Sequence, residues 1–283
     1  MHGNAMIVKL SKARSIWFGL VMGVVIFGFS FWGIDFALGP GDKTLRLLLY
    51  IPACLFLFIY VVLWLSLLNL GYRADEKALT IIWGIRKIVI PWEAMENVVQ
   101  VKGRSNLYSL LGVSWPGYMI GLYNAKGLGP VRMYGTNPWE GFLYIKSKLG
   151  FFGLTPSAEQ MQPLLDYIAA HGQKEIESVD MDAMPREIRG QNMLEDGFYR
   201  TLFILNIVFL AGFAIYLAIC FPGSGAPNFT ILLLVLAIAL FFFDISNAGR
   251  LYQFSDTGGY VLLLISVAVT GLFWILALSE ITL

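Results

Sequence analysis

An abrupt change in charge content and apolar pattern decides the fold of this chain. It falls within residues 45–91, LRLLLYIPACLFLFIYVVLWLSLLNLGYRADEKALTIIWGIRKIVIP. Up to Leu70 the only charged residue is Arg46, and about 20 mostly apolar residues suffice to cross the hydrocarbon core of a bilayer. From Gly71 onward charges return, and short apolar runs alternate with turn residues, which is typical of β-strands. A membrane span is therefore expected to run directly into a water-facing domain.

Other long apolar runs predict further spans on both sides of this domain. Residues 16–38 form the first, joined to residues 45–70 by a tight turn at residues 39–42. After the domain, residues 173–200 make an acidic linker with seven acidic and three basic residues up to Gly197. Three more runs then follow: residues 201–221, 229–247 and 260–278. Because Asp244 interrupts the middle run, we expect five spans, with four as the alternative.

Composition excludes several functional classes. The 283 residues are 57% hydrophobic and 14% charged with a net charge of +1, which argues against binding of nucleic acid. Cys54 and Cys220 lie inside apolar runs, and His2 and His171 have no neighbouring ligand types, so no disulfide framework, metal site or cofactor is expected. The chain is therefore predicted not to be an enzyme.

Residues 71–172 predict several short strands followed by one amphipathic helix. The strands are expected at residues 72–74, 79–83, 86–91, 98–102, 118–123, 131–134, 142–147 and 151–155. The helix opens at Pro156 and ends near His171, with Met161, Leu164 and Ile168 on one face. This order favours a small barrel or sandwich plugged by the helix.

The same region resembles the bacterial pleckstrin-homology-like (PH-like) domains found in multi-spanning membrane proteins. The motifs that carry the resemblance are IPW at 90–92 before Val98, LGVSWPGYMIGLY at 111–123, VRMYGT at 131–136, LYIKS at 143–147 and GLTP at 153–156. Their order fits nearly all of residues 71–172, about a third of the chain. The resemblance implies an α+β membrane protein in which a bent antiparallel β-barrel with a C-terminal helix lies between two groups of transmembrane helices. It also implies binding of lipid headgroups or of proteins.

Basic residues ahead of the first span predict the orientation. Lys9, Lys12 and Arg14 place the N-terminus inside, because lysine and arginine are enriched in cytoplasmic loops. The PH-like domain then also lies in the cytoplasm, and the chain is a multi-pass protein of the cell (inner or plasma) membrane.

Two features of the domain are candidate contact surfaces. Arg86, Lys87, Lys102 and Arg104 are the candidates for contact with anionic lipid headgroups, in a domain with ten basic and seven acidic residues. The alternative is a solvated strand face. The second feature is an apolar insertion at residues 104–117, whose candidate contact residues are Leu107, Tyr108, Leu110, Leu111 and Trp115. It either binds a partner or the membrane, or packs against the chain's own helices.

Polar groups within the predicted spans are candidate transport residues. Asp35, Asp244 and Glu280 lie near predicted span ends, which favours interfacial anchoring, and Asn206 adds a polar group to the third span. The leading expectation is a protein-interaction or assembly module at the membrane, whose partners are the lipid bilayer and another membrane protein or a second copy. The alternatives are a small transporter or channel subunit, or an anionic-lipid-binding module.

Overall fold

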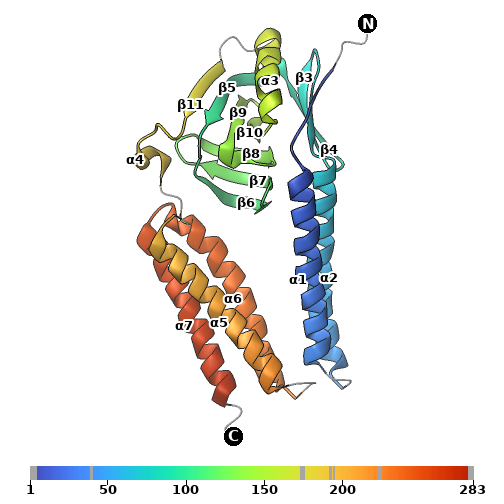
Figure 1. The fold of residues 1–283 in the computed structure, drawn as a ribbon, viewed down its shortest axis with the longest axis vertical. Coiled ribbons are helices and arrows are strands. Elements are labelled where there is room, and N and C mark those ends of the chain that lie inside the picture. Colours follow the sequence, from blue (N-terminus) through green and yellow to red (C-terminus); the bar gives the residue numbers. More distant parts are fainter. Residues whose placement is uncertain are drawn as a thin grey trace. The chain divides into compact units, whose positions relative to one another are not determined.

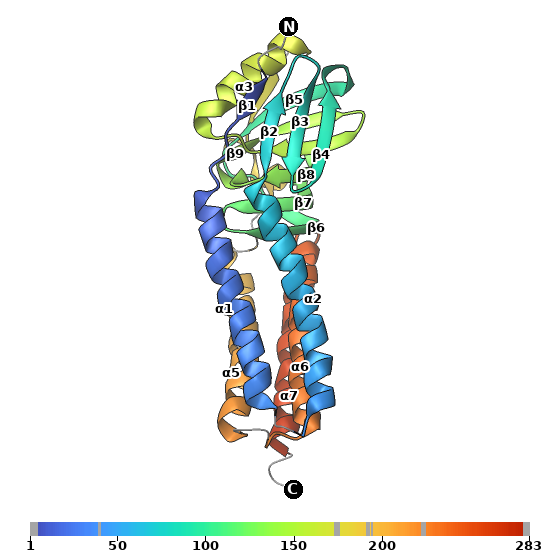
Figure 2. The same cartoon turned by 90° about the vertical axis from the view of Figure 1, so that its right-hand side faces the viewer.

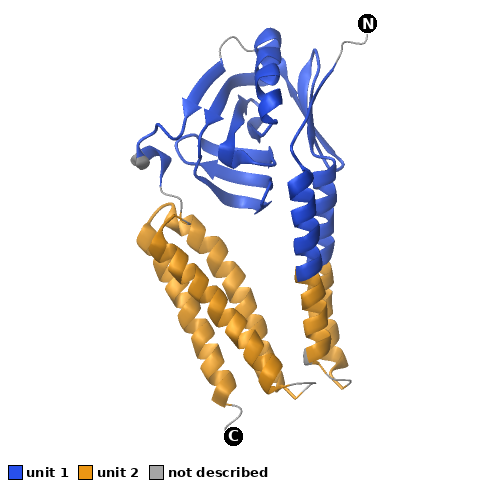
Figure 3. Ribbon diagram, in the orientation of Figure 1, with its two compact units in different colours: residues 1–25, 56–190 blue, residues 26–55, 191–283 orange. Residues whose placement is uncertain are grey.

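The computed structural model describes residues 5–38, 41–172, 176–190, 193, 195–221 and 225–279 (Figure 1). The chain forms two compact units (Figure 3). Unit 1 contains residues 1–25 and 56–190, and unit 2 contains residues 26–55 and 191–283. The division passes through helices α1 (Ala13–Ala37) and α2 (Lys43–Leu68), which each contribute to both units.

Among the described residues, five helices are long and apolar enough to cross a membrane, as judged by length and composition. They are α1, α2, α5 (Gly197–Cys220), α6 (Asn228–Tyr252) and α7 (Asp256–Ser279). The chain is therefore a membrane protein with helices before and after a β-rich domain. Helix α6 ends five residues later than its apolar run predicted, at Tyr252 instead of residue 247.

The smaller sheet joins the two ends of the α1–α2 hairpin (Figure 2). Its strands, all antiparallel, are β1 (Met6–Val8), β2 (Gly71–Ala74), β3 (Ala78–Trp83) and β4 (Arg86–Pro91). Strand β1 precedes α1 and pairs with β2, which follows α2, so that Met6 lies opposite Ala74. Both helices therefore enter the domain through one sheet.

The larger sheet has seven strands in the order β11-β5-β9-β10-β8-β7-β6. Their bounds are β5 (Met95–Lys102), β6 (Leu107–Trp115), β7 (Tyr118–Ala125), β8 (Gly129–Gly135), β9 (Gly141–Ser147), β10 (Gly150–Leu154) and β11 (Ile176–Asp180). Two neighbouring pairs, β11 with β5 and β10 with β8, are parallel.

The expectation of a closed antiparallel barrel is wrong. Over the described residues the two sheets share no strand pairing, so the domain is open. The chain passes from one sheet to the other at Pro91, which has no N–H to extend the ladder, and then through a short 3-10 turn, Trp92–Ala94. What remains of the prediction is an α+β protein with a β-sheet domain.

Helix α3 (Ala158–His171) packs over the core between the two sheets. Its Leu164, Leu165 and Ile168 are buried with Trp92 and with the inner faces of both sheets. Fully burying each such aliphatic side chain stabilises the fold by about 1.5–3 kcal/mol. Leu164 and Ile168 belong to the apolar face that predicted the helix, and the neighbouring Leu165 is buried with them.

Three segments differ from the expected secondary structure. The apolar insertion forms strand β6, and the acidic linker contributes strand β11 and the short helix α4 (Arg186–Arg189). The N-terminal segment contributes β1. The expected turn at Gly39 and Pro40 lies outside the described residues.

In unit 2, helices α5, α6 and α7 pack around buried apolar side chains such as Phe213, Ala237 and Ala277. Asp196 begins this bundle, because its carboxylate accepts hydrogen bonds from the backbone N–H groups of Phe198 (2.8 Å) and Tyr199 (3.1 Å). The hydroxyls of Tyr260 and Tyr252 also donate to it. The hydrogen bond from Tyr260, supported by the others, lowers the pKa of Asp196, so the cap remains charged at neutral pH.

Candidate functional site

The PH-like domain is fixed to the α1–α2 hairpin by two β-hairpin turns, one on each helix. At the β6–β7 turn, the Ser15 hydroxyl in the first turn of α1 donates to the carbonyl of Gly117. At the β3–β4 turn, Gly84 approaches the last turns of α2 so closely that a Cβ there would lie 2.6 Å from the Ser66 hydroxyl oxygen. Each turn therefore touches the helix end nearest to the domain.

Aromatic side chains and one lysine reinforce this attachment. Trp115 is buried against Tyr60, and Tyr118 accepts a hydrogen bond from Trp83 Nε1 at 2.8 Å. The ammonium group of Lys12 donates to the carbonyls of Leu68 (2.8 Å) and Leu70 (2.9 Å), which lack helical partners at the end of α2. These contacts hold the orientation of the domain on the hairpin.

The two helices of the hairpin also lock together. Tyr60 donates to the carbonyl of Gly19 at 2.5 Å, and Trp64 Nε1 donates to that of Ile16 at 3.0 Å. A Cβ at Gly19 would lie 2.9 Å from Trp64, and one at Gly23 would lie 2.5 Å from Tyr60. The small residues of α1 therefore allow close helix contact within the chain.

The five candidate residues of the apolar insertion fall into two groups on β6. Leu107 and Tyr108 are buried in the domain, and Trp115 is buried at the attachment to the helices. Leu110 is half-buried at a β-bulge, and Leu111 is 76% exposed. Val113, which was not singled out from the sequence, is 41% exposed. The exposed part of the insertion is therefore the strand segment 111–114.

Strand β6 is an edge strand without the usual protection. It is nine residues long and contains no charged residue and no proline. The other three edges are protected: β1 has only three residues, β4 carries Arg86, Lys87 and Pro91, and β11 carries two acidic residues. Since natural sheets protect their edges with charge, proline or short length, β6 is the edge open to pairing.

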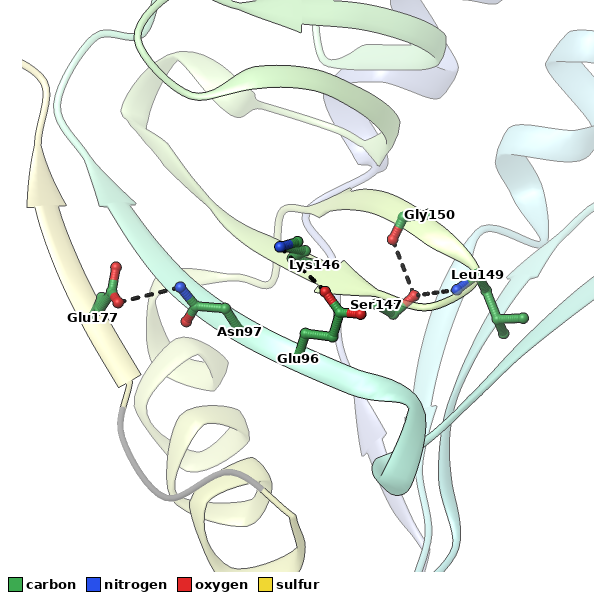
Figure 4. A network of polar contacts seen from close by, with 7 residues as sticks. All are labelled: Glu96, Asn97, Lys146, Ser147, Leu149, Gly150 and Glu177. Atoms are coloured by element: carbon green, nitrogen blue, oxygen red, sulfur yellow. Dashed lines mark hydrogen bonds and ion pairs between the residues drawn. The ribbon is translucent and has the colours of Figure 1, made fainter.

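Polar contacts tie down the opposite edge of the same sheet (Figure 4). Asn97 of β5 donates to Glu177 of β11 at 3.2 Å, and Lys146 pairs with Glu96 at 3.2 Å. In the β9–β10 turn, Ser147 bonds both the carbonyl of Gly150 and the N–H of the next-but-one residue. These contacts join β11, β5, β9 and β10 to one another through their polar side chains.

The structure separates the four candidate basic residues into two pairs on different sheets. Arg86 and Lys87 begin β4 of the smaller sheet, are exposed, and follow the turn that touches α2. No ion pair joins either of them to a described acidic residue. Next to the fully exposed Ile85, they form a cationic and apolar tip at the helix end.

The second pair, Lys102 and Arg104, lies at the end of β5 in an acidic environment. The backbone N–H of Arg104 donates to the carboxylate of Asp182 at 3.3 Å. A Cβ at Gly103 would meet the carboxylates of Asp182 and Asp180. Neighbouring negative charge makes this pair a poor site for an anion.

Polar residues inside the α5–α7 bundle are deeper than the sequence predicted. Asp244 is only 2% exposed and lies eight residues before the end of α6, about 12 Å along the helix. Its Oδ2 and the hydroxyl of the buried Ser266 form no hydrogen bond with described residues. Asn206 bonds the carbonyl of Leu263 at 3.1 Å. Because α6 continues to Tyr252, Asp244 lies farther from the helix end than its apolar run predicted.

The other two acids differ from Asp244. Asp35 lies near the end of α1 with a side chain 57% exposed, 3.8 Å from Arg46. Glu280 lies outside the described residues. Within the described residues, no group of three or more His, Cys, Asp or Glu side chains that could hold a metal ion occurs.

Comparison with known families identifies the domain and little else. Residues 70–164 match the family of bacterial PH domains, about a third of the chain. No curated protein matches the chain, and no solved structure does. The chain thus carries a bacterial PH domain, and its flanking helices have no counterpart in these comparisons.

Proposed function

We propose that this chain is a non-enzymatic protein of the cell membrane whose PH-like domain, on the cytoplasmic side, assembles with another membrane protein. The observation that carries the proposal is the open edge of β6. The occupant of that edge is an extended segment of the partner, which adds a strand to the seven-stranded sheet. Main-chain hydrogen bonds supply the affinity in such strand addition, and exposed side chains such as Leu111 supply the specificity.

The rigid attachment of the domain supports this role. Trp115 ends β6 and is buried against the helix hairpin, so the edge is held in a fixed direction before the partner arrives. A preorganised strand lowers the ordering cost of association. The region after the bulge, residues 111–115, is long enough for a strand of ordinary length.

Photo-cross-linking from residue 111 tests the proposal. A photoreactive amino acid at Leu111 is expected to give one discrete adduct with another protein when intact membranes are irradiated. The control position is Leu149, which is 51% exposed in the β9–β10 turn and should give no such adduct. An absence of protein adducts at residue 111 would refute the proposal, as would cross-links that reach only the chain's own residues. An adduct between two copies would identify the partner as a second copy of this chain, so that the assembly is a homo-oligomer.

The buried Asp244 favours a second candidate function, a small transporter or channel subunit. Ionisable residues inside membrane bundles are costly and commonly mark ion or proton pathways. Here Oδ2 of the buried Asp244 and the hydroxyl of the buried Ser266 make no hydrogen bond of normal geometry with described residues.

Flux measurements separate the two functions. The purified chain in proteoliposomes is compared with Asp244→Asn and with the control Asp35→Asn, whose side chain is largely exposed. Proton or cation flux that Asp244→Asn abolishes and Asp35→Asn retains would support transport. Equal background flux in all three preparations would exclude a transport pathway through Asp244.

A further inference from the structure

The β3–β4 turn presents an unusual tip. Gly84 and Ile85 form its two central positions, between the paired residues Trp83 and Arg86. The positive φ of Gly84 (57°) explains the glycine, because other residues rarely adopt that conformation. Nothing in the turn geometry explains Ile85, which is completely exposed although turns favour small polar residues. The isoleucine therefore requires a reason outside the domain's own packing.

The depth of this tip is fixed by α2. Gly84 lies against Ser66, two residues before the end of that helix, and Trp83 is tied to Tyr118 by its 2.8 Å hydrogen bond. The hydroxyl of Tyr118 in turn reaches the carbonyl of Leu63 at 3.4 Å. Since α2 is a membrane-crossing helix by length and composition, its last turn marks the membrane surface, and the tip lies at that level.

Positive charge surrounds the apolar tip. Arg86 and Lys87 are exposed directly after Ile85, and Arg132 of β8 is also exposed. Arg86 and Arg132 lie near the same residue, Tyr134: burial raises the pKa of its hydroxyl, and the two cations partly oppose that rise. The Tyr134 ring packs edge-on against Trp83, with centroids 6.1 Å apart. Cations from both sheets therefore gather beside the tip.

We infer that the β3–β4 tip inserts into the headgroup layer of an anionic membrane, with Ile85 reaching the acyl boundary and Arg86 and Lys87 binding lipid phosphates. An apolar side chain flanked by cations, at the level of a helix end, matches the layered chemistry of that surface. The inference is independent of the partner at β6, because β4 and β6 are edges of different sheets.

Depth measurement tests the position of Ile85. With Cys54 and Cys220 replaced by alanine, a fluorophore is attached at Ile85→Cys in the full chain in nanodiscs. Lipids spin-labelled near the headgroup are expected to quench it strongly. A fluorophore at Leu149→Cys is the control, because the neighbouring Lys148 donates its N–H to Ala94, beyond the far end of β4. Equal, weak quenching at both positions would overturn the inference.

Charge removal tests the lipid contact. The Arg86→Gln, Lys87→Gln double variant is expected to weaken binding of phosphatidylglycerol to the detergent-solubilised chain about five-fold per residue, measured by lipid titration in native mass spectrometry. The control is Lys77→Gln with Lys148→Gln, which removes two exposed charges away from the tip, one before β3 and one in the β9–β10 turn. Equal losses in both double variants, or no loss in the first, would overturn the phosphate contact. Binding of phosphatidylcholine should not change.

Discussion

Strands β4 and β6 are both sheet edges that begin or end at the helix hairpin, yet their compositions are opposite. β4 starts with Arg86 and Lys87 and ends with Pro91, whereas β6 contains no charge and no proline. A charged edge resists pairing with another strand and tolerates contact with water or headgroups. An uncharged edge offers its backbone to a strand. The protein therefore protects β4 against strand pairing and leaves β6 unprotected. A protein partner is expected at β6.

Adding a positive charge to the uncharged edge β6 should have the largest effect on partner binding. Val113→Lys in β6 is expected to abolish copurification of the proposed partner, because the lysine obstructs strand addition. Val89→Lys in β4, at a similarly exposed valine (50% against 41%), should leave copurification intact. Quantitative mass spectrometry after gentle extraction measures both, and each variant should keep its stability to about 0.5 kcal/mol. Loss of the partner in both variants would end the distinction between the edges.

Removing the anchor of β6 should destabilise the domain most. Trp115→Ala deletes a ring that is 7% exposed and packed against Tyr60 and Tyr118, so a loss of about 3–5 kcal/mol is expected. Trp17→Ala, which alters a ring 67% exposed on α1, should change little. Chemical unfolding in detergent compares the two variants. Similar stabilities would show that the attachment does not depend on Trp115.

Two tyrosines, one in each sheet, should respond differently to loss of the hydroxyl. Tyr72 donates to the carbonyl of Tyr134 and accepts from the N–H of Thr155 at 3.0 Å, so Tyr72→Phe should cost about 1–3 kcal/mol. The buried Tyr123 hydroxyl, beside β6, lies near the side chains of Ser109 and Ser114 but makes no hydrogen bond of normal geometry with described residues. Tyr123→Phe should therefore be neutral or slightly stabilising at pH 7, as measured by urea unfolding. A large loss there would reveal a partner for this hydroxyl.

The same tyrosine predicts an alkaline effect. Burial raises the pKa of Tyr123 from 10.0 to about 12. The folded state thus keeps a proton that the unfolded state releases, and stability should fall between pH 10 and about 12, by about 1.4 kcal/mol per pH unit. Unfolding curves of Tyr123→Phe across this range should lose that part of the slope, and an unchanged slope would assign it to other groups.

The smallest effect is expected at the protected side of the larger sheet. Lys146 and Glu96 are 49% and 43% exposed, so their ion pair should contribute only about 0.2–1 kcal/mol. A double-mutant cycle with Lys146→Gln and Glu96→Gln, at low and high salt, measures it. A coupling free energy above this range would mean that the ion pair contributes substantially to the stability of the sheet.

Apolar runs and short motifs predicted the elements that depend on neighbouring residues in the sequence. They missed the strands that depend on pairing with distant segments. The apolar runs predicted five spanning helices, and the motifs predicted the bacterial PH domain that the family match shows. Strand β6 was missed because its bulge at Leu110 breaks the alternation of apolar and polar residues. Strands β1 and β11 are short, and each pairs with a strand more than sixty residues away. No local pattern reports such a pairing.

The candidate residues show the same limit. Residue type made candidates of residues with different surroundings in the structure. Arg86, Lys87 and Leu111 are exposed, whereas Lys102 lies near carboxylates and Trp115 is buried. Strand register and the packing of the domain on the helices decide among them, and neither can be deduced from the residue types. The position of Asp244 within α6 depends on a related feature, because the helix continues beyond its apolar run through the more polar residues up to Tyr252.

The pairing of β1 with β2 has a consequence for biogenesis. The ribosome makes β1 before either span and β2 only after both. The two strands can pair only if both ends of the hairpin lie on the same side of the bilayer. If only one of the two spans inserted, β1 and β2 would lie on opposite sides of the bilayer, and β2 would lose its neighbour. This three-residue pairing therefore forms only in chains whose first two spans have both crossed the membrane.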